Sequence, residues 1–153
     1  MSTASYEINV APGSAVAYVD GSYNGSVKKF SYGIVFFYNT GRETECLTLS
    51  KAFSHRELLE MHNVAGEIMG AAEAMKRAAQ LELSHITIYH DYEGIEAWCT
   101  GRWKARKVWT KKYKAFYDEI AGSVSVEFVK VKGHSGDIYN DLADSLAKQA
   151  LGI

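Results

Sequence analysis

The sequence predicts one α/β domain in which a five-stranded mixed sheet, a three-strand antiparallel meander plus parallel strands, is flanked by helices. Two observations carry this prediction. Three runs rich in β-branched and aromatic residues follow one another near the start of the chain, and helical and strand patterns then alternate. With 153 residues, of which 47% are hydrophobic and 23% charged, the chain has the length and composition of a single globular domain.

The meander is expected within the first third of the chain. Residues 1–14 show no periodicity and contain the only proline, so we interpret them as an N-terminal arm or linker and residues 15–153 as the domain. Strands are expected over residues 15–20, 32–38 and 45–53, separated by Gly, Asn and Ser. Such short connections favour antiparallel neighbours.

The rest of the chain predicts helices and parallel strands. Apolar residues at helical spacing, preceded by Asn63 as a possible N-cap, predict the first helix. The expected elements are a helix over 64–81, a strand over 86–91, helices over 92–100 and 109–120, a strand over 124–131 and a helix over 140–151. Strands reached through helices run parallel to earlier strands. If the first strand adjoins the fourth, a ligand site is expected beyond their carboxyl ends.

Composition narrows the class of protein. Cys46 and Cys99 are far apart and lack metal-ligand spacing, which argues against a disulfide framework or a zinc site. No stretch approaches the roughly 20 apolar residues of a membrane span. We therefore expect a soluble, cytoplasmic protein without membrane contact, and a monomer.

Basic charge is concentrated in one segment. The chain has a net charge of -1, yet residues 101–114 hold seven Lys or Arg and no acid. The segment is either a nucleic-acid surface or a solvated helix face. Its aromatic residues, with Trp98 before them, have helical spacing, which is more typical of core packing than of base stacking: Trp98, Trp109, Tyr113 and Phe116.

Four carboxylates are candidates for metal chemistry. Asp20 and Asp91 each follow an apolar run, although turn and capping roles are common for Asp at such places. Glu67 and Asp144 fall in expected helices, where a dipole or surface role is the alternative. Carboxylates brought together repel one another unless a cation joins them. An oxygen-only set favours Mg²⁺, or Mn²⁺, and two ions about 3.5–4 Å apart would support phosphodiester hydrolysis.

A histidine is the candidate for proton transfer. His134 stands between glycines in VKVKGHSGD, ten residues before Asp144. Imidazole titrates near neutral pH and moves protons at low cost. The other four histidines have no comparable context, and we expect them to be structural: His55, His62, His85 and His90.

At these residues the chain resembles the type 1 ribonuclease H family, from Ala15 to Gly152. The matching motifs are YVDGS (18–22), YG (32–33), NVAGEIMGA (63–71), IYHD (88–91), VKGHSG (131–136) and NDLADSLAKQA (140–150). Each is weak alone, but their order and spacing are specific. The resemblance implies a ribonuclease H-like fold and an endonuclease that cuts the RNA strand of RNA/DNA hybrids, leaving 5′-phosphate and 3′-hydroxyl ends.

The resemblance also implies residue roles. Metal binding falls to Asp20, Glu67, Asp91 and Asp144, with Asp141 a weaker match for the fourth place. His134 assists proton transfer or product departure. Substrate contacts are expected at Asn63, in the minor groove, at the backbone of Gly21 and Ser22, which can read 2′-hydroxyls, and in a reduced basic handle with Trp103, Lys104, Arg106 and Lys107.

Two features depart from the family pattern, and two other functions stay open. Ala65 stands where many relatives carry an Arg that binds a DNA phosphate, and residues 26–31 replace a Gly/Pro-rich turn. The first alternative function is a DNA nuclease on the same fold, such as a junction resolvase or a transposase-like enzyme. The second is a non-catalytic nucleic-acid-binding module.

Overall fold

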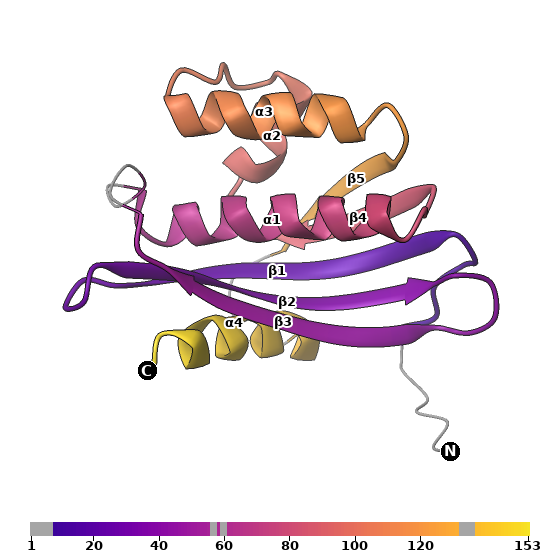
Figure 1. Cartoon of the computed structure of the whole chain (residues 1–153), viewed down its shortest axis with the longest axis horizontal. Helices are drawn as coiled ribbons and strands as arrows, with labels where there is room; N and C mark the ends of the chain where they lie inside the picture. The colour runs from indigo at the N-terminus through magenta and orange to yellow at the C-terminus, as the bar shows by residue number, and fades with distance from the viewer. Residues whose placement is uncertain (1–7, 56–57, 59–60, 132–136) are drawn as a thin grey trace.

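The computed structural model describes residues 8–55, 58, 61–131 and 137–153, and these form a sheet with helices on both faces (Figure 1). The elements are β1 (Ser14–Asn24), β2 (Lys29–Asn39), β3 (Glu45–Phe53), α1 (Asn63–Gln80), β4 (His85–His90), α2 (Gly94–Thr100), α3 (Val108–Ile120), β5 (Ser125–Lys130) and α4 (Ile138–Ala150). The predicted element order and the five-stranded mixed sheet are confirmed.

The sheet has the strand order β3-β2-β1-β4-β5. β1 pairs antiparallel with β2 and parallel with β4, so the expected contact between the first and fourth strands is confirmed. The predicted end of the first strand at Asp20 was wrong. The hairpin with β2 carries β1 on to Asn24, whereas its pairing with β4 stops at Tyr18. Asp20 therefore lies in the part of β1 that extends beyond its pairing with β4.

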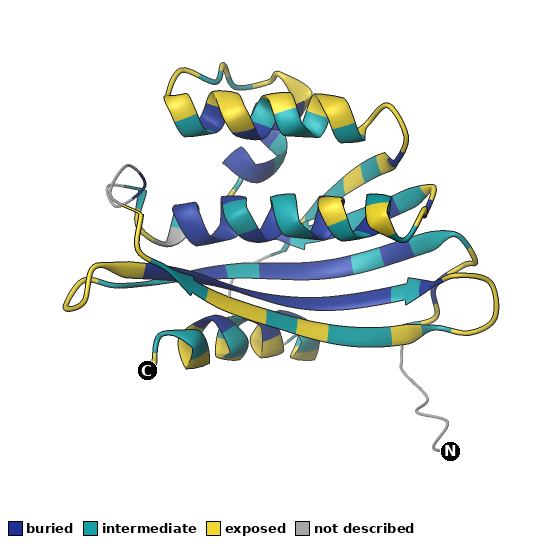
Figure 2. Ribbon diagram, in the orientation of Figure 1, coloured by how far each residue is buried: buried dark blue, intermediate teal, exposed yellow. Residues whose placement is uncertain are grey.

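Helices cover the two faces of the sheet unequally. In Figure 1, α1, α2 and α3 lie on one side of the sheet and α4 lies on the other. The buried residues of α1 pack against alternate residues of the sheet, among them Ala17, Val19, Ile34, Phe36 and Ile88. Figure 2 shows buried segments, in dark blue, in α1 and in the central strands. The helical spacing in α1 and the runs of β-branched and aromatic residues in the strands are the patterns from which the fold was predicted.

Two glycines allow helices to approach the sheet at the end that carries the acids. A Cβ on Gly66, beside Glu67, would overlap the carbonyl oxygen of Ser31. A Cβ on Gly33 would overlap the backbone of α4 at Ala143. Gly33 is the cross-strand partner of Asp20. The contact between Gly33 and the middle of α4 therefore brings that helix beside the Asp20 carboxylate.

The start of α1 differs from the prediction by one residue. The N-cap is His62, not Asn63, and its backbone has a positive φ of 51° without a side-chain capping bond. The His62 ring stacks on Tyr23 at a centroid distance of 4.6 Å. This stacking is consistent with the structural role expected for His62.

Part of the predicted arm packs on the domain. Val10 is buried, its N–H donates to Thr44 Oγ1 at 2.9 Å, and its carbonyl accepts from Asn39 Nδ2 at 2.9 Å. The division of the chain at residue 14 stays a prediction. Within the described residues, no helix combines the length and the apolar character needed to cross a membrane.

Candidate active site

Three of the four predicted carboxylates line one cavity. Asp20 comes from β1, Glu67 from α1, and Asp91 from the residue that follows β4. The remaining lining residues that the structure describes are Val64, Tyr92, Glu93 and Lys130. The cavity lies beyond the carboxyl end of β4, where the sheet topology predicts a ligand site.

Glu67 is fixed at the floor of this cavity. Only 3% of it is exposed, and its two carboxylate oxygens accept from the backbone N–H groups of Asp91, at 3.0 Å, and Tyr92, at 2.8 Å. Burial raises the pKa of Glu67 to about 8. The two hydrogen bonds lower the pKa, but their effect is smaller than that of burial. The charges of Asp20 and Asp91 raise the pKa further. The buried carboxylate of Glu67 thus joins α1 to the residues that follow β4.

Asp20 experiences the same crowding. Burial is the largest cause that raises its pKa to about 7, and the nearby carboxylates of Asp144 and Asp91 add to the effect. One hydrogen bond opposes this, because Asp20 Oδ1 accepts from the N–H of Gly21 at 2.9 Å. A divalent cation would relieve this crowding, because it favours the ionised form of both acids.

Asp144 lies beside Asp20 but does not line the cavity. Its Oδ2 forms an ion pair with Lys148 Nζ, one helical turn further along α4, at 3.0 Å. Asp141 is exposed in the first turn of α4, whereas Asp144 is close enough to Asp20 to raise its pKa. This position favours Asp144 over Asp141 as the fourth acid.

The acids have the ligand chemistry that a hard cation prefers, although their side chains are not arranged as a complete coordination shell. Among the described residues, no group of three Asp, Glu, His or Cys side chains is arranged to hold a metal ion. The donors are all carboxylate oxygens, which Mg²⁺ and Mn²⁺ prefer. The ion pair with Lys148 uses one oxygen of Asp144, Oδ2, which leaves Oδ1 for an ion.

Two other predicted residues, Gly21 and Ser22, follow Asp20 on β1. Gly21 is buried and Ser22 is half-buried. His134 lies outside the described residues, as does the side chain of Asn63. The roles of these residues stay predictions.

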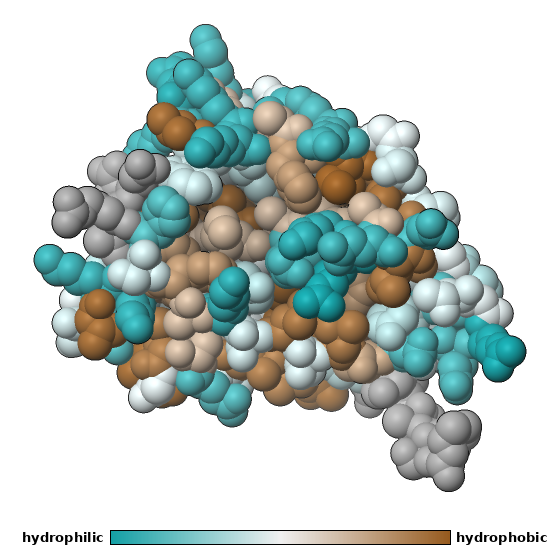
Figure 3. Space-filling view, in the orientation of Figure 1, coloured by the Kyte–Doolittle hydropathy of each residue, from teal (hydrophilic) through white to brown (hydrophobic). Residues whose placement is uncertain are grey.

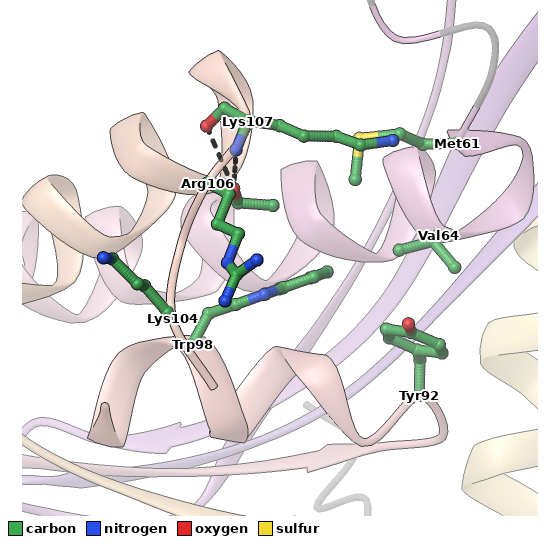
Figure 4. Close-up of a pocket in the computed structure, with 8 residues that line it drawn as sticks. Met61, Val64, Tyr92, Trp98, Lys104, Arg106 and Lys107 are labelled. Carbon is green, nitrogen blue, oxygen red and sulfur yellow. Dashed lines mark hydrogen bonds between the residues drawn. The ribbon is translucent and has the colours of Figure 1, made fainter. Parts of the chain in front are cut away.

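A second cavity adjoins the acidic one and is lined in part by residues of the basic segment (Figure 4). Its lining residues are Met61, Val64, Tyr92, Trp98, Lys104, Arg106, Lys107 and Thr110. It shares Val64 and Tyr92 with the acidic cavity, and a third cavity, which includes Trp103, shares Trp98 and Lys104 with it. The three cavities adjoin one another through these shared residues, and we call the two that carry the basic residues the groove. Figure 3 shows hydrophilic side chains over α3.

The aromatic residues of this region divide between core and groove. Tyr113 is buried and donates its hydroxyl to the carbonyl of Ile95 at 2.8 Å, and Phe116 packs against the same core, so the core interpretation is confirmed for both. Trp98 also packs against the core, yet it lines the groove and contacts the rings of Tyr92 and Trp103 at 5.8 and 5.9 Å. Trp98 therefore combines the two roles.

The absent arginine is replaced by an apolar contact. Ala65 is fully buried in a cluster with Phe30 and Leu58. Phe30 comes from the segment that replaces the Gly/Pro-rich turn, so the two departures from the family pattern meet in space. The described structure therefore places no cation at this position of α1.

Three charged residues near the acids were missed by sequence reasoning. Glu93 and Lys130 line the acidic cavity, and Lys148 pairs with Asp144. The end-of-strand argument that found Asp91 could have found Lys130, because Lys130 ends β5 beside His90. The i,i+4 spacing on α4 could have found Lys148.

Comparisons with known proteins agree with this architecture. The chain superposes on the RNase H1 of Halobacterium salinarum with a TM-score of 0.71 at 20% identity, over 91% of this chain and 98% of that one. LC11-RNase H1, solved in complex with an RNA/DNA hybrid, gives a TM-score of 0.67 at 16% identity, over 90% and 99% of the two chains. Both likenesses show the fold.

Sequence similarity shows the family. The family model described as RNase H matches residues 12–152. The ribonuclease H of Pseudoalteromonas translucida is 33% identical over 145 residues, which cover 88% of each chain. The chain belongs to the ribonuclease H family, a family of nucleases.

Proposed function

We propose that this protein is an endoribonuclease that hydrolyses the RNA strand of RNA/DNA hybrids with two divalent metal ions, Mg²⁺ or, as a substitute, Mn²⁺. The products would carry 5′-phosphate and 3′-hydroxyl ends. One observation carries the proposal: Asp20, Glu67 and Asp91 line a single cavity in a chain of the ribonuclease H family. The hybrid bound to LC11-RNase H1 supports the choice of substrate.

The four acids would hold the ions, and the protein supplies their orientation. Bound ions would activate the attacking water and neutralise the leaving oxygen of an in-line displacement. Glu67 needs no reorientation of its own, because two backbone N–H groups already fix its carboxylate. Asp144 would complete the set from α4, with Lys148 paired to its Oδ2. His134 would move the proton of the departing group.

The groove would accommodate the DNA strand while the RNA strand enters the acidic cavity. Lys104, Arg106 and Lys107 are exposed along it and can contact phosphates, and Trp103 offers an apolar surface to the sugars. Asn63 would reach the minor groove. The backbone of Gly21 and Ser22 would contact the 2′-hydroxyls that distinguish RNA from DNA.

A panel of three labelled duplexes tests this function. We expect a hybrid to be cleaved with Mg²⁺ and left intact without it, and DNA and RNA duplexes of the same sequence to stay intact. Cleavage of the DNA duplex would favour a DNA nuclease on this fold. Binding of the hybrid without cleavage would favour a non-catalytic module.

His134→Ala should lower turnover by about 100-fold without abolishing it, since proton transfer contributes roughly that much and the acids remain. His85→Ala is the control, because His85 contacts Thr87 Oγ1 on the same strand rather than the cavity. Rates are measured between about pH 6 and pH 9. A His134→Ala rate equal to wild type over that range would make His134 structural.

Replacing Lys104, Arg106 and Lys107 together by Ala should raise KM for the hybrid and flatten the salt dependence of affinity by about 0.9 per lost phosphate contact on a log-log scale. The melting temperature should hold, because the bonds at the start of α3 join the Thr110 hydroxyl to the backbone of Lys107, which alanine keeps: Thr110 Oγ1 donates to the Lys107 carbonyl at 2.9 Å and accepts from the Lys107 N–H at 3.1 Å.

The control for this triple variant replaces Lys29, Arg42 and Lys76, which are exposed away from the groove. Their replacement should leave KM and the salt slope unchanged. A groove variant that melts at a clearly lower temperature, or that keeps the wild-type salt slope, would make the basic segment a solvated helix face.

A further inference from the structure

Lys130 is the only cation among the described residues that line the acidic cavity. Its companions there include four acids: Asp20, Glu67, Asp91 and Glu93. The backbone of a nucleic-acid strand that enters such a cavity is repelled by each of them. A positive charge in this position therefore acts on the substrate more directly than a surface lysine elsewhere.

The fold fixes where Lys130 stands. It is the last residue of β5 and the register partner of His90, so it lies across from the residue that precedes Asp91. The next N–H along the chain, that of Val131, donates to the carbonyl of His90 at 2.7 Å. The backbone on either side of the side chain is thus held against the end of β4.

An acid close enough to feel the charge of Lys130, Glu93, is already paired with another cation. Glu93 pairs with Arg102, its Oε2 lying 2.7 Å from the Arg102 guanidinium. Lys130 is exposed, and within the part of the chain that the structure describes no carboxylate lies within ion-pair distance of its ammonium. Residues 132–136, KGHSG, contain no acidic side chain. The ammonium is free to take an anion from the substrate.

We propose that Lys130 is a substrate-positioning residue whose ammonium binds a backbone phosphate of the strand that enters the acidic cavity. The inference rests on the proposed function, since it takes the cleaved strand as its ligand. A lysine suits this place because it acts as a mobile point charge and does not require the planar geometry of a guanidinium pair. Its contact offsets the repulsion between the acids and the phosphates.

The test compares Lys130→Met and Lys130→Arg with Lys76→Met, because Lys76 is an exposed lysine of α1 that lines none of the three cavities. Hybrid binding is measured without divalent ions at several salt concentrations, so that no cleavage intervenes, and KM and kcat are then measured with Mg²⁺. Lys130→Met should bind about 3- to 10-fold more weakly at low salt and lose about 0.9 of log-log salt slope. KM should rise more than kcat falls.

Lys130→Arg should recover most of the affinity, Lys76→Met should match wild type, and all three should melt within a few degrees of wild type. Wild-type affinity and salt slope in Lys130→Met would overturn the proposal. So would a clearly lower melting temperature in Lys130→Met with unchanged affinity, because Lys130 would then be a counter-ion for the acids of the folded protein. If wild type binds the hybrid without cleaving it, the proposed function fails, and the binding comparison still decides the role of Lys130.

Discussion

Replacing Asp91 or Asp20 by Asn is expected to lower hybrid cleavage by more than about 10³-fold, the upper range for removing one electrostatic group from a catalytic site. Each change removes an anionic oxygen from the cavity and preserves side-chain size, so the fold should survive. Hybrid binding should also survive, because the basic segment and Lys130 remain. Single-turnover rates with saturating Mg²⁺ measure the loss.

Asp141→Asn is the matched control, because Asp141 is an exposed acid on the helix that carries Asp144. It should cleave the hybrid at the wild-type rate. If Asp20→Asn or Asp91→Asn cleaved at a similar rate, the assignment of the metal-binding acids would be wrong. If Asp141→Asn were inactive and Asp144→Asn active, the fourth acid would be Asp141.

The same Asp20→Asn variant should be more stable than wild type in the absence of metal. The folded protein raises the pKa of Asp20 to about 7, so the folded state holds this proton more tightly than the unfolded chain does. Wild-type stability therefore falls as the pH rises from about 4 to about 7, and Asn escapes this loss. The difference in melting temperature should be larger at about pH 8 than at about pH 5, measured in chelator.

Metal affinity should weaken steeply in acid, which is the second large effect. A divalent ion must displace protons from Glu67, with a pKa of about 8, and Asp20, with a pKa of about 7. Since both acids are ionised only above these values, the apparent affinity should fall by more than about 100-fold from pH 8 to pH 6. Ordinary carboxyl groups would already be ionised throughout that range.

Calorimetric titration of the protein with Mn²⁺, in buffers of different ionisation enthalpy, measures both the affinity and the protons released. We expect between one and two protons to leave per protein near pH 6, and fewer near pH 8. Asp141→Asn should reproduce the wild-type titration. An affinity that does not change with pH would mean that the ions bind away from Glu67 and Asp20.

The order of helices and strands could be predicted from local sequence patterns. The exact ends of those elements depend on contacts with residues far away in the sequence. Runs of β-branched and aromatic residues predicted the strands, and helical spacing of apolar residues predicted the helices. The true end of β1 could not be predicted, because it depends on how far β2 continues the hairpin, beyond the last pairing with β4 at Tyr18. The N-cap is His62 instead of Asn63, because the backbone of His62 has a positive φ, which the sequence does not predict.

The acids could be predicted as candidates from the sequence, whereas the contacts that hold them together could not. Asp20 and Asp91 follow apolar runs, which is a local signal. The backbone clamp on Glu67 joins α1 to the residues after β4, 24 and 25 positions away, and arises only when the sheet is assembled. Lys130 likewise enters the cavity through the register of β5 with β4. Local patterns find candidate groups, and tertiary pairing decides which of them meet.

Strand-specific, metal-dependent cleavage is tested most directly with one RNA/DNA hybrid that carries a separate label on each strand, incubated with wild type and with Asp91→Asn in Mg²⁺ or chelator. We expect wild type with Mg²⁺ to shorten only the RNA strand and to leave 5′-phosphate and 3′-hydroxyl ends. We expect wild type to be inactive in chelator, and Asp91→Asn to leave both strands intact. Cleavage of the DNA strand, RNA products with cyclic phosphate ends, or undiminished cleavage in chelator would contradict the proposed function.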